Sequence, residues 1–330
     1  MGSFNMTDSP MKPSARGMVL EIQRMSTEDG PGLRTTVFLK GCPLACDWCH
    51  NPESISPKPQ LVWQGTGCIG CGICIETCEN NALSLTPGGV VINRDLCQGC
   101  GHCADQCPSL SITLLGVTWT AQDLVKELAK DRAYFQSSRG GVTLSGGEAT
   151  LQHEFSLEVL KGLQAQGIHT ALDTCGMTAI SILEKLLGHT DLLLFDIKEM
   201  DETRHKSFTG ASNAIILENL MQLPGLLKKH PTELWIRTPI IPGATDRDDN
   251  IRSMGSFIAL HLKDTVCRWE LCAFNTLGKD KYTRLGKTWA HETTLPMEKR
   301  RMDNLVETAL ESGLDRAIVV HTGATRPISP

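Results

Sequence analysis

Eleven of the fourteen cysteines lie between Cys42 and Cys107. Eight of them form two runs with the spacing C-x2-C-x2-C-x3-C, namely Cys68, Cys71, Cys74 and Cys78, then Cys97, Cys100, Cys103 and Cys107. This spacing is typical of a pair of 4Fe–4S clusters in which the fourth cysteine of each run ligates the cluster of the other run. We therefore predict one cluster on Cys68, Cys71, Cys74 and Cys107 and a second on Cys97, Cys100, Cys103 and Cys78. Zinc suits this spacing less well, because its ligands usually come as two pairs from separated turns.

The three remaining cysteines of this region, Cys42, Cys46 and Cys49, follow a short apolar run that is predicted to be a strand. Their spacing, C-x3-C-x2-C, puts three thiolates on one loop and leaves a four-iron cluster with one iron open to a substrate. Two other interpretations remain: a zinc ion completed by His50, or three buried free thiols. His50 follows Cys49 directly, which is an awkward geometry for two ligands of the same ion.

Composition and charge narrow the class of protein. The chain has 330 residues, with 32 basic and 37 acidic side chains, so neither a nucleic-acid surface nor a polybasic membrane anchor is expected. No apolar run approaches the roughly 20 residues that span a bilayer, and residues 1–17 lack the apolar core of a signal peptide. We therefore expect a cytoplasmic protein whose clustered cysteines bind metal rather than form disulfides.

Beyond residue 115 apolar strands alternate with longer helices. The predicted strands are 37–39, 142–145, 169–174, 192–197, 234–241, 268–274 and 317–321, and the predicted helices begin near 120, 156, 180, 215, 250 and 298. Such alternation indicates a parallel sheet that is buried on both faces. Six main βα units are too few for a closed eight-stranded barrel, so we predict an α/β fold of the partial (β/α)6, TIM-like type. Active-site groups should then lie at the C-terminal ends of the strands.

Residues 57–115 interrupt this pattern. They hold eight cysteines and two strand-like runs, 83–85 and 90–93, with almost no helical periodicity. We therefore divide the chain into a disordered lead-in (1–17), a barrel (18–56 and 116–323), an inserted bacterial-ferredoxin-like domain with two 4Fe–4S clusters (57–115) and a C-terminal tail (324–330). Thr120 and Asp123 resemble a capping box that opens the first helix after the insert.

The third cysteine set resembles a known family. C-x3-C-x2-C with Trp48 before the last cysteine is the signature of radical S-adenosylmethionine enzymes, and the segment from Glu28 to Thr36 resembles the activating enzymes of glycyl radical enzymes. The likeness extends from about residue 19 to residue 322, and a large subgroup of these activating enzymes carries a ferredoxin-type insert. The resemblance implies a third 4Fe–4S cluster on Cys42, Cys46 and Cys49, with S-adenosylmethionine as cosubstrate.

Further positions match the family's cosubstrate motifs. Gly146, Gly147 and Glu148 resemble the motif that receives the amino group of S-adenosylmethionine, where glycines let the backbone approach and a carboxylate neutralises the ammonium. The resemblance implies that Lys198 meets the methionine carboxylate, and that oxygens of Asp173 and Asp196 lie beside a monovalent cation. The expected catalytic residues are Cys42, Cys46, Cys49 and Lys198. The expected cofactor-binding residues are His50, Gly146, Gly147, Glu148, Asp173, Thr174, Asp196, Lys198, His205, Arg237 and Asn275.

One of these positions departs from the family pattern. Asn275 stands where the family usually has a histidine that contacts the ribose, and an amide can also donate and accept hydrogen bonds there. Outside the ligand sets, Cys175, Cys267 and Cys272 have no ligand spacing and are predicted to be buried or free thiols.

The resemblance also implies a reaction and its partners. A flavodoxin or ferredoxin supplies an electron, and cleavage of S-adenosylmethionine yields a 5′-deoxyadenosyl radical that takes a hydrogen from a glycine Cα of a partner glycyl radical enzyme. One alternative is a radical enzyme acting on a small molecule or peptide, against which residues 29–32 and the Asp196-x-Lys198 motif argue. The other alternative, a ferredoxin-type electron carrier, leaves the third cysteine set and the six βα units unexplained.

Overall fold

The computed structural model describes residues 14–326, and a nine-stranded sheet is its main feature. The strand order is β13-β12-β11-β10-β9-β8-β2-β1-β7. The strands are β1 (Arg16–Ser26), β2 (Arg34–Leu39), β7 (Val117–Thr120), β8 (Gly141–Gly146), β9 (His169–Thr174), β10 (Leu192–Asp196), β11 (Glu233–Ile240), β12 (Val266–Ala273) and β13 (Val319–Thr322). From β2 and β8 to β13 all neighbours are parallel, whereas β1 pairs antiparallel with both β2 and β7. The mixed α/β fold with a mostly parallel sheet is therefore confirmed.

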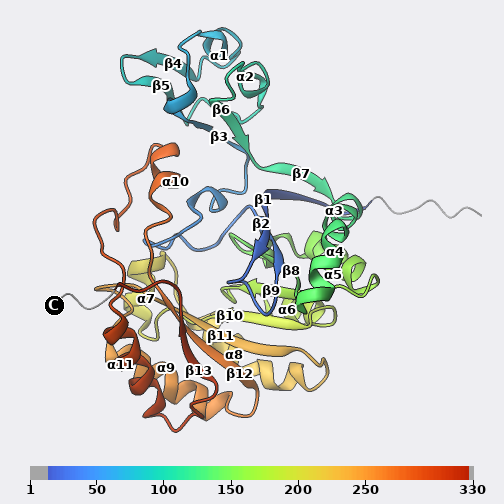
Figure 1. Cartoon of the computed structure of the whole chain (residues 1–330), viewed down its shortest axis with the longest axis vertical. Coiled ribbons are helices and arrows are strands. Elements are labelled where there is room, and N and C mark those ends of the chain that lie inside the picture. The colour runs from blue at the N-terminus through green and yellow to red at the C-terminus, as the bar shows by residue number, and fades with distance from the viewer. Residues whose placement is uncertain (1–13, 327–330) are drawn as a thin grey trace, which may run out of the picture.

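Helices connect the parallel strands and cover the outside of the curved sheet (Figure 1). They are α3 (Ala121–Leu128), α4 (Arg132–Ser138), α5 (His153–Gln164), α6 (Ile180–Leu187), α7 (Glu202–Thr209), α8 (Ala214–Leu227), α9 (Asp248–His261), α10 (Lys279–Arg284) and α11 (Lys299–Leu310). The predicted start of α3 is confirmed, because Thr120 is the N-cap residue of this helix and its hydroxyl accepts a hydrogen bond from the Asp123 N–H at 3.1 Å. Within residues 14–326, no helix combines the length and the apolar character that crossing a bilayer requires.

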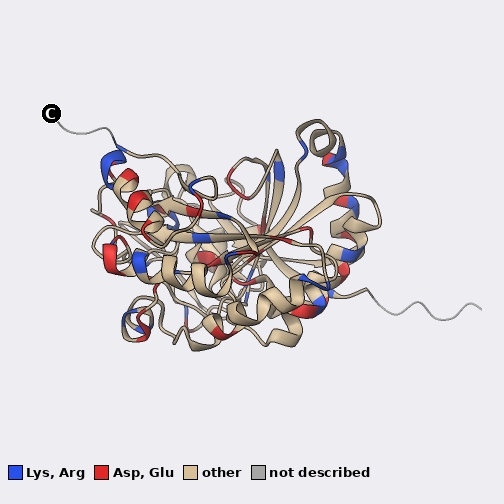
Figure 2. Ribbon diagram, turned by 90° about the horizontal axis from the view of Figure 1, so that it is seen from below, with Lys and Arg blue, Asp and Glu red and all other residues tan. Residues whose placement is uncertain are grey.

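The core lies between the sheet and these helices. Every residue from Leu192 to Phe195 in β10 is fully buried, as expected for a central parallel strand covered on both faces. Basic and acidic residues are both spread over the ribbon, in keeping with the nearly balanced composition (Figure 2).

The lead-in predicted for residues 1–17 ends earlier than expected, and residues 1–13 lie outside the described part. β1 begins at Arg16, and its Val19 pairs with Leu39 of β2. A Cβ at Gly17 would come within 2.2 Å of the Phe155 ring, so this glycine permits close packing on α5. The strand was missed because polar and apolar residues mix along it. Of the predicted tail, Arg326 still contacts the fold through an ion pair with Glu298 at 2.7 Å, and residues 327–330 lie outside the described part.

The insert forms a small unit of its own beyond the cysteine loop (Figure 1). Strands β3 (Gln60–Trp63) and β6 (Ile112–Leu115) pair at its base, and the two predicted strand-like runs form the hairpin of β4 (Leu83–Thr86) and β5 (Gly89–Ile92). Each cysteine run contains one turn of helix, α1 (Ile73–Glu76) or α2 (His102–Asp105). A separate apolar cluster fills the unit, formed by Leu61, Cys74, Leu83, Val90, Cys103 and Ile112.

Candidate active site

The C-terminal ends of the parallel strands and the loop after β2 enclose a cavity of about 490 Å³. Twelve residues predicted from the sequence line it: Cys42, Cys46, Cys49, His50, Gly146, Gly147, Asp173, Thr174, Asp196, Lys198, Arg237 and Asn275. The carboxyl ends of parallel strands meet at one edge of a sheet, which explains why residues so distant in sequence converge here. Glu148 and His205 do not line the cavity.

The loop carrying Cys42, Cys46 and Cys49 is held by the C-terminus of α7. The Ala45 N–H donates to the Thr209 carbonyl (2.8 Å), and the Asp47 N–H donates to the Phe208 carbonyl (3.0 Å). The last carbonyls of a helix have no partner within the helix, so α7 can offer them to the loop. The sequence did not reveal α7, because this short helix is polar on nearly all sides.

His50 follows the three thiols directly and is held by contacts with the loop after β12. Its Nε2–H donates to the Asn275 carbonyl at 2.9 Å, which fixes the tautomer because a carbonyl can only accept. The ring packs against Phe274 and Trp289, at centroid distances of 5.9 and 6.0 Å. Burial lowers the pKa of His50, so the ring is neutral and positions the loop after β12.

The three thiols of the cysteine loop are suited to a cationic group. Burial raises the pKa of Cys46 to about 12 and that of Cys49 to about 11, so thiolates need a cationic centre to form here. In residues 14–326, no three His, Cys, Asp or Glu side chains are grouped as ligands of one metal ion.

Two cysteines outside the predicted ligand sets also reach the cavity. Cys175 and Cys272 line it, whereas Cys267 is exposed. The Cys175 thiol lies against Cys42, and this contact, together with burial, holds the pKa of Cys175 well above its usual value. Cys175 is therefore a protonated thiol beside a predicted cluster ligand, a placement that its sequence spacing did not indicate.

Glu148 acts inside the wall of the cavity rather than at its surface. One carboxylate oxygen accepts from the Thr150 N–H (3.0 Å) and the Thr174 hydroxyl (2.8 Å), and the other accepts from the Cys175 N–H (2.8 Å). The side chain is 1% exposed. Both oxygens are occupied in joining the loops after β8 and β9, so this geometry argues against the predicted contact of Glu148 with an amino group.

Asp173 lies at the end of β9 and faces the cavity. Its carboxylate accepts from the Ser145 hydroxyl at 2.6 Å and lies 3.8 Å from a guanidinium nitrogen of Arg237. Burial raises the pKa of Asp173 to about 7, even though Arg237 opposes the shift and Asp196 adds to it. An additional cation at this position would therefore be favourable.

Lys198 and Asp196, at the end of β10, form an ion pair of 2.5 Å on the cavity wall. Burial favours the neutral amine of Lys198, but the Asp196 carboxylate outweighs it and holds the pKa above the usual value. Lys198 is therefore a fixed positive charge, suited to a carboxylate ligand.

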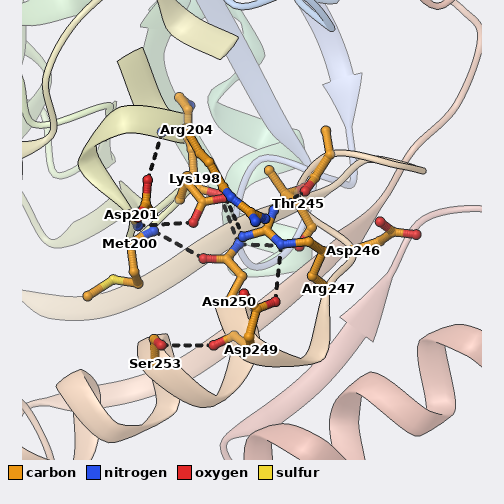
Figure 3. Close-up of polar contacts among 12 residues, drawn as sticks. Lys198, Met200, Asp201, Arg204, Thr245, Asp246, Arg247, Asp249, Asn250 and Ser253 are labelled. Carbon is orange, nitrogen blue, oxygen red and sulfur yellow. Dashed lines mark hydrogen bonds and ion pairs between the residues drawn. The ribbon is translucent and has the colours of Figure 1, made fainter. Parts of the chain in front are cut away.

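The backbone around Lys198 is held by hydrogen bonds from residues at the start of α9 (Figure 3). The Asn250 amide donates to the Lys198 carbonyl (3.5 Å) and accepts from the Met200 N–H (3.0 Å). Arg247 donates to the buried carboxylate of Glu199 at 3.0 Å. Asn250 lies in the first turn of α9 and Arg247 is the residue directly before this helix, so the start of α9 fixes the loop after β10.

Arg237 belongs to a row of charges across neighbouring strands. It pairs in register with Asp196 of β10 and with Glu270 of β12. The Glu270 carboxylate is buried, 3.6 Å from Arg237 and 2.6 Å from Arg268. Sequence reasoning missed Glu270, although a lone acidic residue within an apolar strand is the signal that marks it.

His205 lies behind the cysteine loop instead of in the cavity. It is 1% exposed, and its Nδ1–H donates to the Ala211 carbonyl at 2.7 Å. Burial lowers the pKa of His205, so the ring is neutral. Its place in α7 gives it an indirect role, because α7 holds the cysteine loop.

Comparison with known proteins agrees with this geometry. A family model described as a 4Fe-4S single cluster domain matches residues 28–217, more than half of the chain. The chain is 40% identical to the (2S)-3-sulfopropanediol dehydratase activating enzyme of Klebsiella oxytoca over 84% of its own length and 87% of the relative. It is 36% identical to the 4-hydroxyphenylacetate decarboxylase activating enzyme of Clostridioides difficile strain 630, over 90% and 94%. This chain belongs to the activating enzymes of glycyl radical enzymes, which are radical S-adenosylmethionine enzymes.

Among solved structures, a radical SAM methyltransferase from Sphaerobacter thermophilus is similar in fold. Its TM-score is 0.50, with 13% sequence identity over 96% of this chain and 80% of the methyltransferase. At this identity the likeness concerns the fold alone.

In this activating enzyme the departure at Asn275 has a clear geometry. The side-chain oxygen accepts from the Leu277 N–H at 3.0 Å, and the backbone carbonyl accepts from His50. Both oxygens of Asn275 thus already accept hydrogen bonds. Because Asn275 lines the cavity, its side-chain amide nitrogen can donate a hydrogen bond to a ligand there.

The eight cysteines of the activating enzyme's insert gather in two groups. A small cavity within the insert is lined by Cys68, Cys71, Cys74 and Cys107, together with apolar residues such as Ile69 and Leu85. The second group is formed by Cys78, Cys97, Cys100 and Cys103. Burial raises the pKa of Cys103 to about 11, and the nearby thiols of Cys78, Cys97 and Cys100 add to this shift. The grouping is the crossed one, in which the fourth cysteine of each run joins the first three of the other.

Proposed function

We propose that this activating enzyme cleaves S-adenosylmethionine at Cys42, Cys46 and Cys49 and takes a hydrogen from a glycine Cα of a partner glycyl radical enzyme. The observation that carries the proposal is the convergence of these thiols with Lys198, Asp173 and Asn275 around one cavity. A 4Fe–4S cluster on the three thiolates would supply the electron and an open iron for the reductive cleavage.

The side chains around the thiols would bind and orient the cosubstrate. Lys198 offers a fixed positive charge to the methionine carboxylate, and Gly146 and Gly147 let the ligand approach the backbone closely. A Cβ at Gly147 would come within 2.2 Å of the Gly41 carbonyl oxygen. The absence of a side chain at Gly147 therefore allows the loops after β2 and β8 to stay in contact. The Asn275 amide would donate to the ribose, the role that a histidine has in the family.

We assign the remaining polar groups of the cavity to charge balance. Asp173 and Asp196 would share a monovalent cation, which would return the pKa of Asp173 toward its ordinary range. Arg237 would hold the Asp173 carboxylate in place, and its Nη2–H donates to the Glu28 carbonyl at 3.3 Å. His50, Glu148 and His205 would act through the loops that they position.

We further propose a partial (β/α)6 barrel with a ferredoxin-type insert at 57–115, three 4Fe–4S clusters in all, and a cytoplasmic location. The crossed grouping of the insert cysteines supports the two additional clusters. A flavodoxin or ferredoxin would be the electron donor.

The partner should be a glycyl radical enzyme, but relatives of similar identity activate different ones by name, a sulfopropanediol dehydratase and a hydroxyphenylacetate decarboxylase. Purified enzymes of both types should therefore be tested as partners. Formation of a glycyl radical signal in the EPR spectrum of one of them would identify the class.

The function itself is tested by anaerobic reconstitution, with analysis of iron and sulfide, followed by dithionite and S-adenosylmethionine. About twelve irons per chain and the appearance of 5′-deoxyadenosine and methionine are expected. About eight irons without 5′-deoxyadenosine would mean that Cys42, Cys46 and Cys49 hold no cluster, and the electron-carrier interpretation would replace the proposal.

A further inference from the structure

The two cysteine groups of the insert are not equivalent in their relation to the barrel. The cavity formed by Cys68, Cys71, Cys74 and Cys107, the outer quartet, is lined only by residues between Cys68 and Ile112, all of them in the insert. Two apolar side chains beside this quartet face solvent, Ile69 at 68% and Leu110 at 72% exposure. The outer quartet is therefore surrounded by residues of the insert and by solvent.

The loop of the other group, Cys78, Cys97, Cys100 and Cys103, packs against the connection to the barrel. A Cβ at Gly99 would lie 2.6 Å from the Pro59 carbonyl oxygen, so the loop between Cys97 and Cys100 rests on that segment. The same segment reaches the cysteine loop of the barrel, because Pro57 lies 3.5 Å from the Cβ position of Gly41. This group is called here the inner quartet. The segment from Pro57 to Pro59 thus connects the inner quartet to Gly41, the residue that precedes Cys42.

A chain of polar contacts joins the inner quartet to the barrel from a second side. Arg94, three residues before Cys97, donates to the Leu61 carbonyl at 2.5 Å and to the Arg284 carbonyl at 3.4 Å. Arg284, at the end of α10, in turn lies 3.5 Å from the buried carboxylate of Glu53.

The same region is anchored next to Cys49. Lys281 of α10 donates to the Asn51 side chain at 2.6 Å, and the Lys40 ammonium donates to the Glu53 carbonyl at 2.5 Å. Arg94, Arg284 and Glu53 therefore form a bridge, called here the arginine bridge, from the inner quartet to the segment directly after the barrel's cysteine loop.

We propose that the inner quartet, Cys78, Cys97, Cys100 and Cys103, is the electron relay next to the active site, and that the arginine bridge fixes it against the barrel. The inference rests on the proposed function. Each transfer moves one electron: a low-potential flavodoxin or ferredoxin is oxidised by one electron, and the group on Cys42, Cys46 and Cys49 is reduced by one through the inner quartet. No bond forms or breaks in this relay.

The relay order is tested by EPR on the full, anaerobically reconstituted chain with S-adenosylmethionine bound. Magnetic coupling between reduced clusters depends steeply on their distance, so the inner quartet should broaden the signal of the active-site cluster most. Cys100→Ala and Cys71→Ala are a matched pair, because both cysteines are exposed and each is the second of its run. We expect the broadening to be lost in C100A and kept in C71A, and the opposite pattern would overturn the relay order.

The bridge is tested without touching a ligand. Arg94→Met should keep the iron content of the wild type, lose most of the broadening, and slow reduction of the active-site cluster by a protein donor at least about tenfold. Arg316→Met, which removes an exposed pair with Glu307, is the control and should change none of these readouts. Unchanged broadening in R94M would overturn the role of the bridge, even if C100A loses its insert clusters altogether.

These outcomes are distinguishable from failure of the proposed function. A chain that forms no 5′-deoxyadenosine with dithionite lacks the proposed activity, whatever its EPR spectrum. A chain that forms 5′-deoxyadenosine but shows the reversed pattern of broadening keeps that activity and refutes only the relay.

Discussion

At the scale of single residues, Lys198 is the charge on which cosubstrate binding should depend most. Replacing Lys198 with Met removes a fixed ammonium from a buried wall, where a charge-assisted hydrogen bond is worth about 1.5–3 kcal/mol. We expect K198M to bind S-adenosylmethionine roughly 10- to 150-fold more weakly, measured from 5′-deoxyadenosine formation against cosubstrate concentration. Lys229→Met is the matched control, because Lys229 is exposed and pairs with Glu184 on the surface. Equal affinity in K198M and the wild type would contradict the assignment.

Glu148 is the residue whose expected role the geometry changes. Its two oxygens accept three hydrogen bonds from Thr150, Thr174 and Cys175, and an amide cannot accept all three. We therefore expect Glu148→Gln to lower the free energy of unfolding by about 1–3 kcal/mol, visible as a lower melting temperature without ligand. If E148Q instead kept its melting temperature and lost only affinity for S-adenosylmethionine, the contact with the amino group predicted from the sequence would be right.

At the scale of elements, α7 is the support of the cysteine loop, and His205 is the titratable residue that this helix buries. Burial lowers the pKa of folded His205 below the value of about 6.5 expected in the unfolded chain. The unfolded state therefore binds more protons as the pH falls through about 6.5, so His205 makes the protein less stable at pH 5.5 than at pH 7.5.

Substitution of His205 should remove this contribution. We expect the melting temperature of H205Q to change less between pH 7.5 and 5.5 than that of the wild type, even if H205Q is less stable at both. His261→Gln, at an exposed position in α9, serves as the control and should keep the pH dependence of the wild type. An identical pH dependence in H205Q would refute the argument.

The strands that the sequence predicted are continuous apolar segments, whereas the elements that it missed have a mixed or polar sequence. Strands such as β10 are continuously apolar, so their sequence alone predicts that both of their faces are buried. In contrast, β1 alternates irregularly, and α7 and α10 are short and polar, so tertiary contacts decide their structure. The cavity residues were predictable because they lie at strand ends, whereas the inward position of the Glu148 carboxylate depends on loop contacts that no motif records.

At the scale of the whole molecule, the unit built on the main sheet and the small unit of residues 57–115 have separate apolar cores. Among the described residues, the cluster of the small unit contains no residue from outside 57–115, and the large core contains none from within it. Gln60 and Leu115 are paired in β3 and β6, so the two ends of the insert lie side by side. A short flexible linker could therefore replace residues 61–114 without stretching the unit built on the main sheet.

We expect such a shortened chain to fold and to bind about four irons in place of about twelve, because Cys42, Cys46 and Cys49 remain. Dithionite should still support cleavage of S-adenosylmethionine, since a small reductant can reach the cavity directly. Reduction by flavodoxin or ferredoxin should be slower, because the relay through the inner quartet is absent. The measurements are iron content and 5′-deoxyadenosine formation with each reductant. If the shortened chain folded and matched the full chain with the protein donor, the insert clusters would not be on the path of the electron. If it bound no iron, contacts that the removed residues make with the rest of the chain, such as that of Arg94 with the Arg284 carbonyl, would be needed to form the active site itself.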